Sequence, residues 1–142
     1  MFDYKKYSYL STVFLRLGLG LVFLWPSISK LFSKVDALGI CTNRAEAVEM
    51  VASFSWLPIP PEIFVTFQSW FELALGILLI VGIWVDLAAI VSALLFISFF
   101  VFLDFDLVWK NMALLGASLA LFFAPADKWQ IKFKSKSASI PE

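Results

Sequence analysis

A carboxylate in the middle of an apolar stretch is the first feature of this sequence that could do chemistry. Glu72 lies in "FQSWFELALG", about eleven residues into a run long enough to cross a membrane, and Gln68 precedes it by one helical turn. A lone carboxylate near the centre of a bilayer costs at least ~2–3 kcal/mol. Glu72 should therefore be protonated or paired with a cation. Its function is then either to move a proton or only to hold helices together by hydrogen bonds.

Two cations lie on one face of the first apolar run. Arg16 and Lys30 are linked by steps of four, three, four and three residues, which places both on the same side of a helix. They would lie about 21 Å apart along the helix axis. Either both point into the protein, where one could pair with Glu72, or each extends its long stem to the lipid headgroups.

The last apolar run adds a lysine and an amide, Lys110 and Asn111, near its start. Together these polar groups predict one pocket between helices, walled by Phe23, Trp25, Trp70, Phe71 and Trp109. For Trp25 and Trp109 the alternative is a place in the aromatic belt at the membrane interface. A kink at Pro26, a buried acid and nearby cations suit a flat lipid with a polar head, such as a quinone. We assign Glu72 as the candidate catalytic residue. The candidate binding residues are Arg16, Lys30, Gln68, Lys110 and Asn111.

The composition places this chain in a membrane. It has 142 residues, of which 61% are hydrophobic and 15% charged. A globule of this size cannot hide so much apolar surface in one core, so the excess should face lipid. The formal net charge is zero and histidine is absent, so nothing indicates a nucleic-acid partner.

Metal and redox ligands are scarce in the sequence. Cys41 is the single cysteine, which excludes an internal disulfide and a CxxC pair and leaves its own role open. We expect no metal site, and no haem, flavin or iron–sulfur ligand set is evident. We therefore expect no intrinsic cofactor, and an electron carrier would be a quinone or would come from a partner.

Helical spans must position the polar groups, because backbone groups in lipid need partners within their own segment. Four runs are long enough to cross a bilayer: residues 10–33, 61–83, 85–103 and 107–125. The connection 34–60 predicts a short interfacial helix, and residues 126–142 form a polar tail. The predicted fold is thus all-α, a single transmembrane domain over residues 1–142: a four-helix bundle with a short interfacial helix in its first loop.

Two of these runs carry packing signals. The run 85–103 has only two serines as interior polar groups and should be the helix most exposed to lipid. The run 107–125 carries a stripe of small residues that favours close helix approach. The stripe consists of Ala113, Gly116, Ala117 and Ala120.

Basic residues at the two ends predict the orientation of the chain. Lysines precede the first run and follow the last, whereas the connections between runs carry balancing or excess acids. By the positive-inside rule both termini are cytoplasmic, which agrees with four crossings. The lysines are Lys5, Lys6, Lys128, Lys132, Lys134 and Lys136.

Three of the quoted stretches resemble the DoxX family of small four-helix membrane proteins. They are "LRLGLGLVFLWPSISKLF", "FELALGILLIVGIWVDLAA" and "WKNMALLGASLAL", and the resemblance spans most of residues 10–124. Members of that family are associated with membrane redox complexes, including a thiosulfate:quinone oxidoreductase made of two small membrane subunits.

The resemblance implies an integral subunit of a redox-linked complex in a prokaryotic inner membrane, binding a quinone-like lipid near Glu72. The alternative is a structural or assembly subunit that docks a partner protein in the membrane. Whether the chain is itself an enzyme stays open, because it holds no complete catalytic constellation. The implied partners are the lipid bilayer and other membrane-complex subunits or a second copy of the chain.

Overall fold

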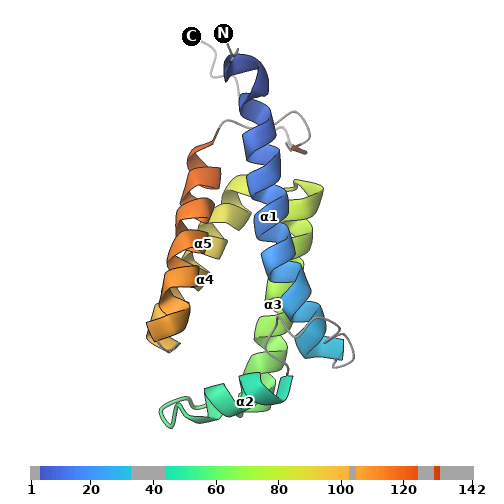
Figure 1. Ribbon diagram of the computed structural model, residues 1–142. Helices are drawn as coiled ribbons and strands as arrows, with labels where there is room; N and C mark the ends of the chain where they lie inside the picture. Colours follow the sequence, from blue (N-terminus) through green and yellow to red (C-terminus); the bar gives the residue numbers. More distant parts are fainter. Residues whose placement is uncertain (1–3, 33–43, 103–104, 125–129, 132–142) are drawn as a thin grey trace, which may run out of the picture.

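The structure is a computed structural model that describes residues 4–32, 44–102, 105–124 and 130–131, with side chains described from residue 10 onward and not over 101–109. Cys41 and the basic residues of the tail lie outside the described residues. The described part contains five helices (Figure 1). They are α1 (Tyr4–Phe32), α2 (Arg44–Ala52), α3 (Pro61–Val81), α4 (Val85–Phe102) and α5 (Phe105–Phe123).

The all-helical prediction is confirmed, and the predicted helix starts at 61 and 85 match the structure. Pro61 is the first residue of α3, where its missing N–H would have no partner in any case. Gly82 ends α3 with φ 83°, a left-handed conformation that favours glycine, and its N–H donates to the Leu78 carbonyl at 2.9 Å. α1 begins earlier than predicted, at Tyr4 rather than at residue 10.

The helices pack as two pairs, α1 with α3 and α4 with α5, and contacts between the pairs are few. Figure 1 shows that the pairs meet near the α3–α4 turn and diverge toward the end of the molecule where α2 lies. We call this the α2 end; α1 finishes there and α3 begins there. The short turn between α3 and α4 predicts that these two helices are antiparallel neighbours. They are antiparallel in the structure, but they diverge from one another away from the turn.

A glycine contact brings α1 and α3 together. A Cβ atom added to Gly76 would lie 2.9 Å from the Gly20 carbonyl oxygen and 3.0 Å from the Leu24 nitrogen, which are backbone atoms that cannot rotate away. The predicted small-residue stripe on α5 makes no such contact with the part of the chain that the structure describes. Ala113, Gly116 and Ala120 are exposed, and a Cβ on Gly116 would meet nothing within 4 Å.

The hydrophobic core lies where the two pairs meet. It includes Leu19 and Phe23 of α1, Leu79 of α3 and Phe96 of α4, and the rings of Phe23 and Phe96 stack with centroids 5.1 Å apart. The expectation that residues 85–103 form the most exposed helix is wrong. α4 buries one face against α5, and the buried residues are Val85, Ala88, Ala89, Ser92, Ala93 and Phe96.

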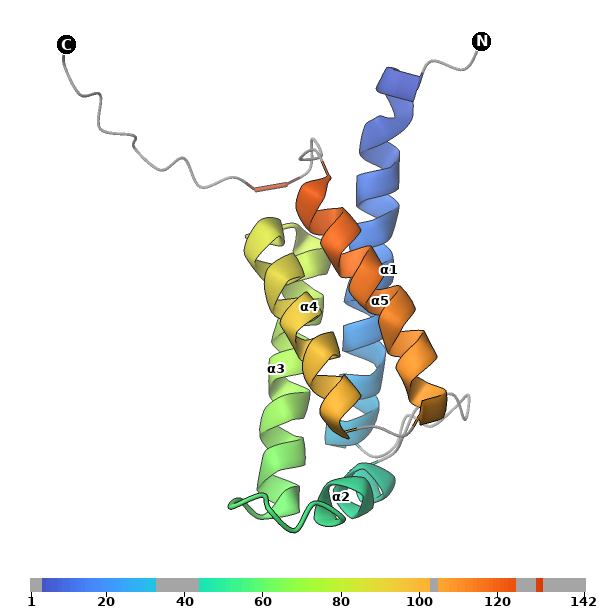
Figure 2. The same cartoon turned by 90° about the vertical axis from the view of Figure 1, so that its left-hand side faces the viewer.

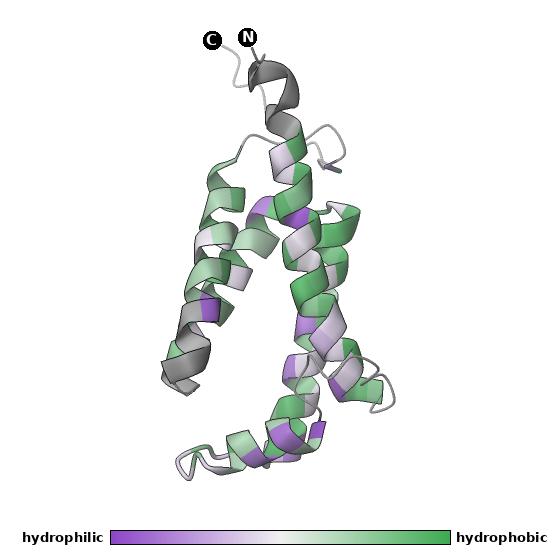
Figure 3. Cartoon of the chain, viewed as in Figure 1, coloured by the Kyte–Doolittle hydropathy of each residue, from purple (hydrophilic) through white to green (hydrophobic). Residues whose placement is uncertain are grey.

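The outer surface of the described helices is strongly apolar. Phe14, Phe67 and Phe123 are 70%, 74% and 79% exposed. Two helical segments, Leu10–Phe32 and Pro61–Val81, are long and apolar enough to cross a membrane; α4 and α5 contribute shorter apolar segments. In Figure 3 green covers most of the long helices, while purple gathers on α2 and recurs at single positions along the other helices. Such a surface is what a helical protein presents to lipid.

Candidate functional site

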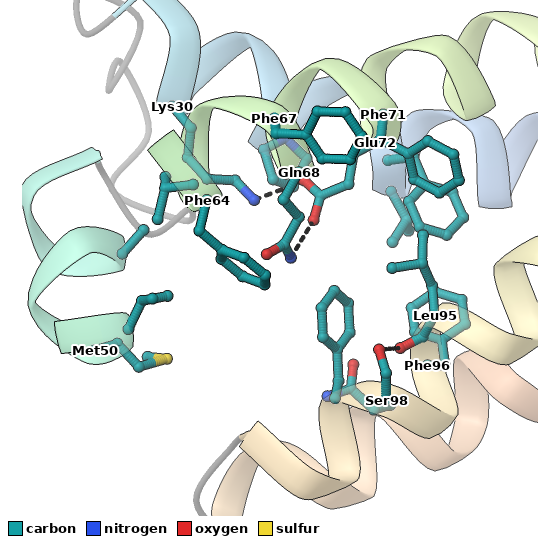
Figure 4. A pocket seen from close by; sticks show the side chains of 18 of the residues that line it. Lys30, Met50, Phe64, Phe67, Gln68, Phe71, Glu72, Leu95, Phe96 and Ser98 are labelled. Atoms are coloured by element: carbon teal, nitrogen blue, oxygen red, sulfur yellow. Dashed lines mark hydrogen bonds and ion pairs between the residues drawn. The ribbon is translucent and has the colours of Figure 1, made fainter. Parts of the chain in front are cut away.

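A cavity of about 560 Å³ occupies the α2 end, between the α1–α3 pair and the α4–α5 pair. α2 and the segment after it close one end of the cavity with Met50, Val51 and Phe54. Figure 4 shows side chains of α3 facing those of α4 across the space. The volume is within the range of about 300–1,000 Å³ typical of ligand pockets.

A buried ion pair lies on the α1–α3 wall of this cavity. Lys30 Nζ donates to Glu72 Oε2 at 2.6 Å, and Gln68 Nε2 donates to Glu72 Oε1 at 3.1 Å (Figure 4). Glu72 is only 5% exposed. Both carboxylate oxygens of Glu72 therefore accept hydrogen bonds from protein donors. The ammonium of Lys30 offsets the free-energy cost of burying the carboxylate. Lys30 points into the protein and not to the headgroups.

Local sequence explains this arrangement. Gln68 and Glu72 are one helical turn apart on α3, so both face the same side. The close approach of Gly20 and Gly76 sets α1 against α3, and Lys30 lies near the end of α1, within reach of Glu72. Pro26, one turn before Lys30, also lines the cavity.

The α4–α5 wall supplies a second polar group. Lys110 and Asn111 of α5 line the cavity; Lys110 is exposed and Asn111 is 8% exposed. Ser98 of α4 also lines it, and its hydroxyl donates to the Leu95 carbonyl at 2.7 Å. The predicted pocket residues thus reach one cavity from three different helices.

Most of the cavity wall is aromatic or aliphatic, and sequence analysis found only part of it. Phe23 and Phe71 line the cavity as expected. Trp25 and Trp70 are 40% and 54% exposed and are not among its lining residues, and the side chain of Trp109 is not described. The aromatic residues and the methionine missed are Phe54, Phe64, Phe67, Phe96, Phe99 and Met50. Spacing by three and four residues with Phe71 was the available signal for the two on α3.

Arg16 lies apart from the other candidate binding residues. It is 2% exposed, so it points inward, but it is not among the residues that line the cavity. Its place on α1, almost four turns before Lys30, accounts for the separation. The shared helical face brings both cations inside the protein without bringing them to one site.

A comparison with known protein families shows the family to which this chain belongs. The sequence profile of the DoxX family matches residues 11–104. The chain belongs to the DoxX family. Membership of DoxX indicates a membrane protein, in agreement with the apolar exterior. Neither the comparison with curated proteins nor that with solved structures found a match.

The DoxX match covers one wall of the cavity and part of the other. Lys30, Gln68 and Glu72 lie inside the matched residues, whereas the match ends before α5. Lys110 and Asn111, and the resemblance in "WKNMALLGASLAL", are therefore outside it. Among the described residues of this DoxX protein, no three His, Cys, Asp or Glu side chains are placed to hold a metal ion.

Proposed function

We propose that this DoxX protein is an integral membrane subunit of a redox-linked complex and that its cavity binds a quinone-like lipid. The observation that carries the proposal is a buried, hydrogen-bonded Lys30–Glu72 pair in the wall of a largely aromatic cavity. Sites of this kind combine apolar walls that hold a flat ring with a few polar groups that fix its oxygen atoms.

The proposed bilayer arrangement has four crossings, by α1, α3, α4 and α5, in one domain over residues 1–142. α2 then lies at the non-cytoplasmic surface of a prokaryotic inner membrane, and both termini are cytoplasmic. The apolar exterior of the helices supports this arrangement, as does the position of α2 at the end of the molecule where α3 begins (Figure 2). The cavity would open toward the outer half of the bilayer.

The residues of the cavity have distinct proposed roles. The Lys30 ammonium, already within hydrogen-bond distance of Glu72, donates to a ring oxygen, and Glu72 accepts or releases a proton at that oxygen. Gln68 orients the carboxylate through its other oxygen. A bound quinone supplies the electron chemistry, and a partner subunit exchanges electrons with it.

Glu72→Gln tests the proton role. The amide keeps the size of the side chain and can accept from Lys30, so the protein should still insert and fold. It cannot accept a proton, so quinone-dependent turnover of the purified complex should fall at least about 100-fold, as expected for loss of a general acid–base group. Turnover would be measured on the complex purified in mild detergent, with co-purifying proteins and lipids identified.

Glu62→Gln is the matched control for that substitution. Glu62 lies in the first turn of the same helix, is exposed, and does not line the cavity, so its variant should keep full turnover. Unchanged turnover in Glu72→Gln would contradict the proton role.

The second candidate function is a structural or assembly subunit that docks a partner protein or a second copy. The exposed small-residue face of α5 favours it, because a helix from another chain could approach Gly116 without a steric clash. In that case Glu72→Gln would leave both turnover and the set of co-purifying proteins unchanged.

A further inference from the structure

The space between the two helix pairs opens toward the outside of the protein. Phe67 and Phe71 of α3 line the cavity and are also 74% and 40% exposed, so they stand at its edge. In a bilayer this edge faces acyl chains. An amphiphile could therefore keep its head inside the cavity while its chains pass beside α3 into the lipid.

The charges on the described lining residues of the cavity do not balance. Its described lining residues include two lysines, Lys30 and Lys110, and one carboxylate, Glu72, which leaves one positive charge in excess. Lys30 is paired with Glu72. Lys110 has no ion-pair partner among the residues that the structure describes. The positive charge in excess is therefore the Lys110 ammonium, on the α4–α5 wall.

Asn111 is the second observation on that wall. It is 8% exposed, lines the cavity, and makes no hydrogen bond to any residue in the described part of the chain. Because Asn111 lines the cavity and no described residue takes up its amide, its donors are available to a molecule inside the cavity. Its N–H groups and the Lys110 ammonium line the same cavity, and together they offer donors that suit an oxyanion.

We propose that Lys110 and Asn111 bind the phosphate of an anionic membrane phospholipid, whose acyl chains leave the cavity along Phe67 and Phe71. Sixteen of the 22 described lining residues are apolar, which favours an anion that carries hydrocarbon over a free, hydrated one. Basic pockets between membrane helices are general sites for acidic headgroups. The proposal goes beyond quinone binding, because it concerns the other wall and a charged occupant.

Lipid titration of the full-length protein tests this assignment. The protein would be exchanged into lipid-free detergent, and phosphatidylglycerol or phosphatidylcholine with identical acyl chains would be added and followed by native mass spectrometry. Phosphatidylglycerol should bind about tenfold more tightly, and Lys110→Gln should remove that preference. Asn111→Leu should weaken phosphatidylglycerol binding about fivefold. Lys110 is exposed, so its variant should fold normally.

Two control variants show whether the lipid preference arises at the α5 wall. Arg44→Gln removes a cation of α2 that does not line the cavity, and it should leave the lipid preference intact. Glu72→Gln should not weaken phosphatidylglycerol binding, which distinguishes this proposal from the quinone proposal. Equal binding of the two lipids by the wild type, or loss of the preference in Glu72→Gln, would overturn the assignment. So would competition by glycerol phosphate at the lipid's own concentration, since the ligand would then be the free anion.

Discussion

Lys30→Met is expected to lower the free energy of unfolding in detergent micelles by about 3–5 kcal/mol. The substitution removes the ammonium at 2.6 Å from Glu72, which is 5% exposed, and among the described residues only Gln68 then donates to the carboxylate. A buried charge that loses its counter-charge keeps its desolvation cost and loses the attraction that offset it. Thermal or denaturant unfolding followed by circular dichroism would measure the loss.

The double variant Lys30→Met/Glu72→Leu should recover most of that stability. It removes both charges and fills the site with apolar groups, and such replacements are often neutral or stabilising. Lys110→Met serves as the control, because Lys110 is exposed and has no ion-pair partner among the described residues; its effect should stay within about 0.5 kcal/mol. A single variant as stable as the wild type, or a double variant no better than the single, would contradict the buried pair.

Gly76→Ala is expected to destabilise the protein by about 1–3 kcal/mol, although alanine is normally the better helix former. The new methyl group would lie 2.9 Å from the Gly20 carbonyl oxygen, so α1 and α3 must separate. That separation should also lengthen the Lys30–Glu72 contact, since both residues depend on how these helices cross. The same unfolding measurement would report the loss.

Gly18→Ala is the matched control for the glycine contact. Gly18 is on the same helix as Gly20, and a Cβ at Gly18 would meet nothing within 4 Å. This variant should be as stable as the wild type or slightly more stable, by up to about 1 kcal/mol from helix propensity. If Gly76→Ala and Gly18→Ala behaved alike, the α1–α3 crossing would not be as close as the structure has it.

The sequence predicts the helices well, because the signals that define them are local. Proline at the first turn and glycine at the last mark α3 within two residues, and apolar length identifies the other long helices. The juxtaposition of Lys30 with Glu72 also follows from the sequence in outline. A carboxylate in the hydrocarbon core of a membrane is unfavourable unless a cation pairs with it. The helical spacing places Lys30 on a face that can point inward.

What sequence cannot predict is which apolar faces meet. All long helices here are apolar nearly all round, so periodicity does not distinguish a side chain that faces a cavity from one that faces lipid. For this reason the sequence does not identify the aromatic wall around Phe64 and Phe99, it places Trp70 in the cavity wall, and it predicts that α4 is exposed. Arg16 illustrates the same limit. Its inward face was predictable, but its distance from the cavity depends on where the helix pairs diverge.

Photolabelling with a quinone that carries a light-activated group tests the central claim most directly. The full-length protein would be labelled in membranes, digested, and the modified residues mapped by mass spectrometry. We expect adducts on the cavity walls, at residues 64–72 of α3 and 95–99 of α4, and a marked loss of labelling when excess unlabelled quinone is added. Adducts confined to the outer faces of the helices, or labelling that unlabelled quinone does not reduce, would contradict quinone binding in the cavity.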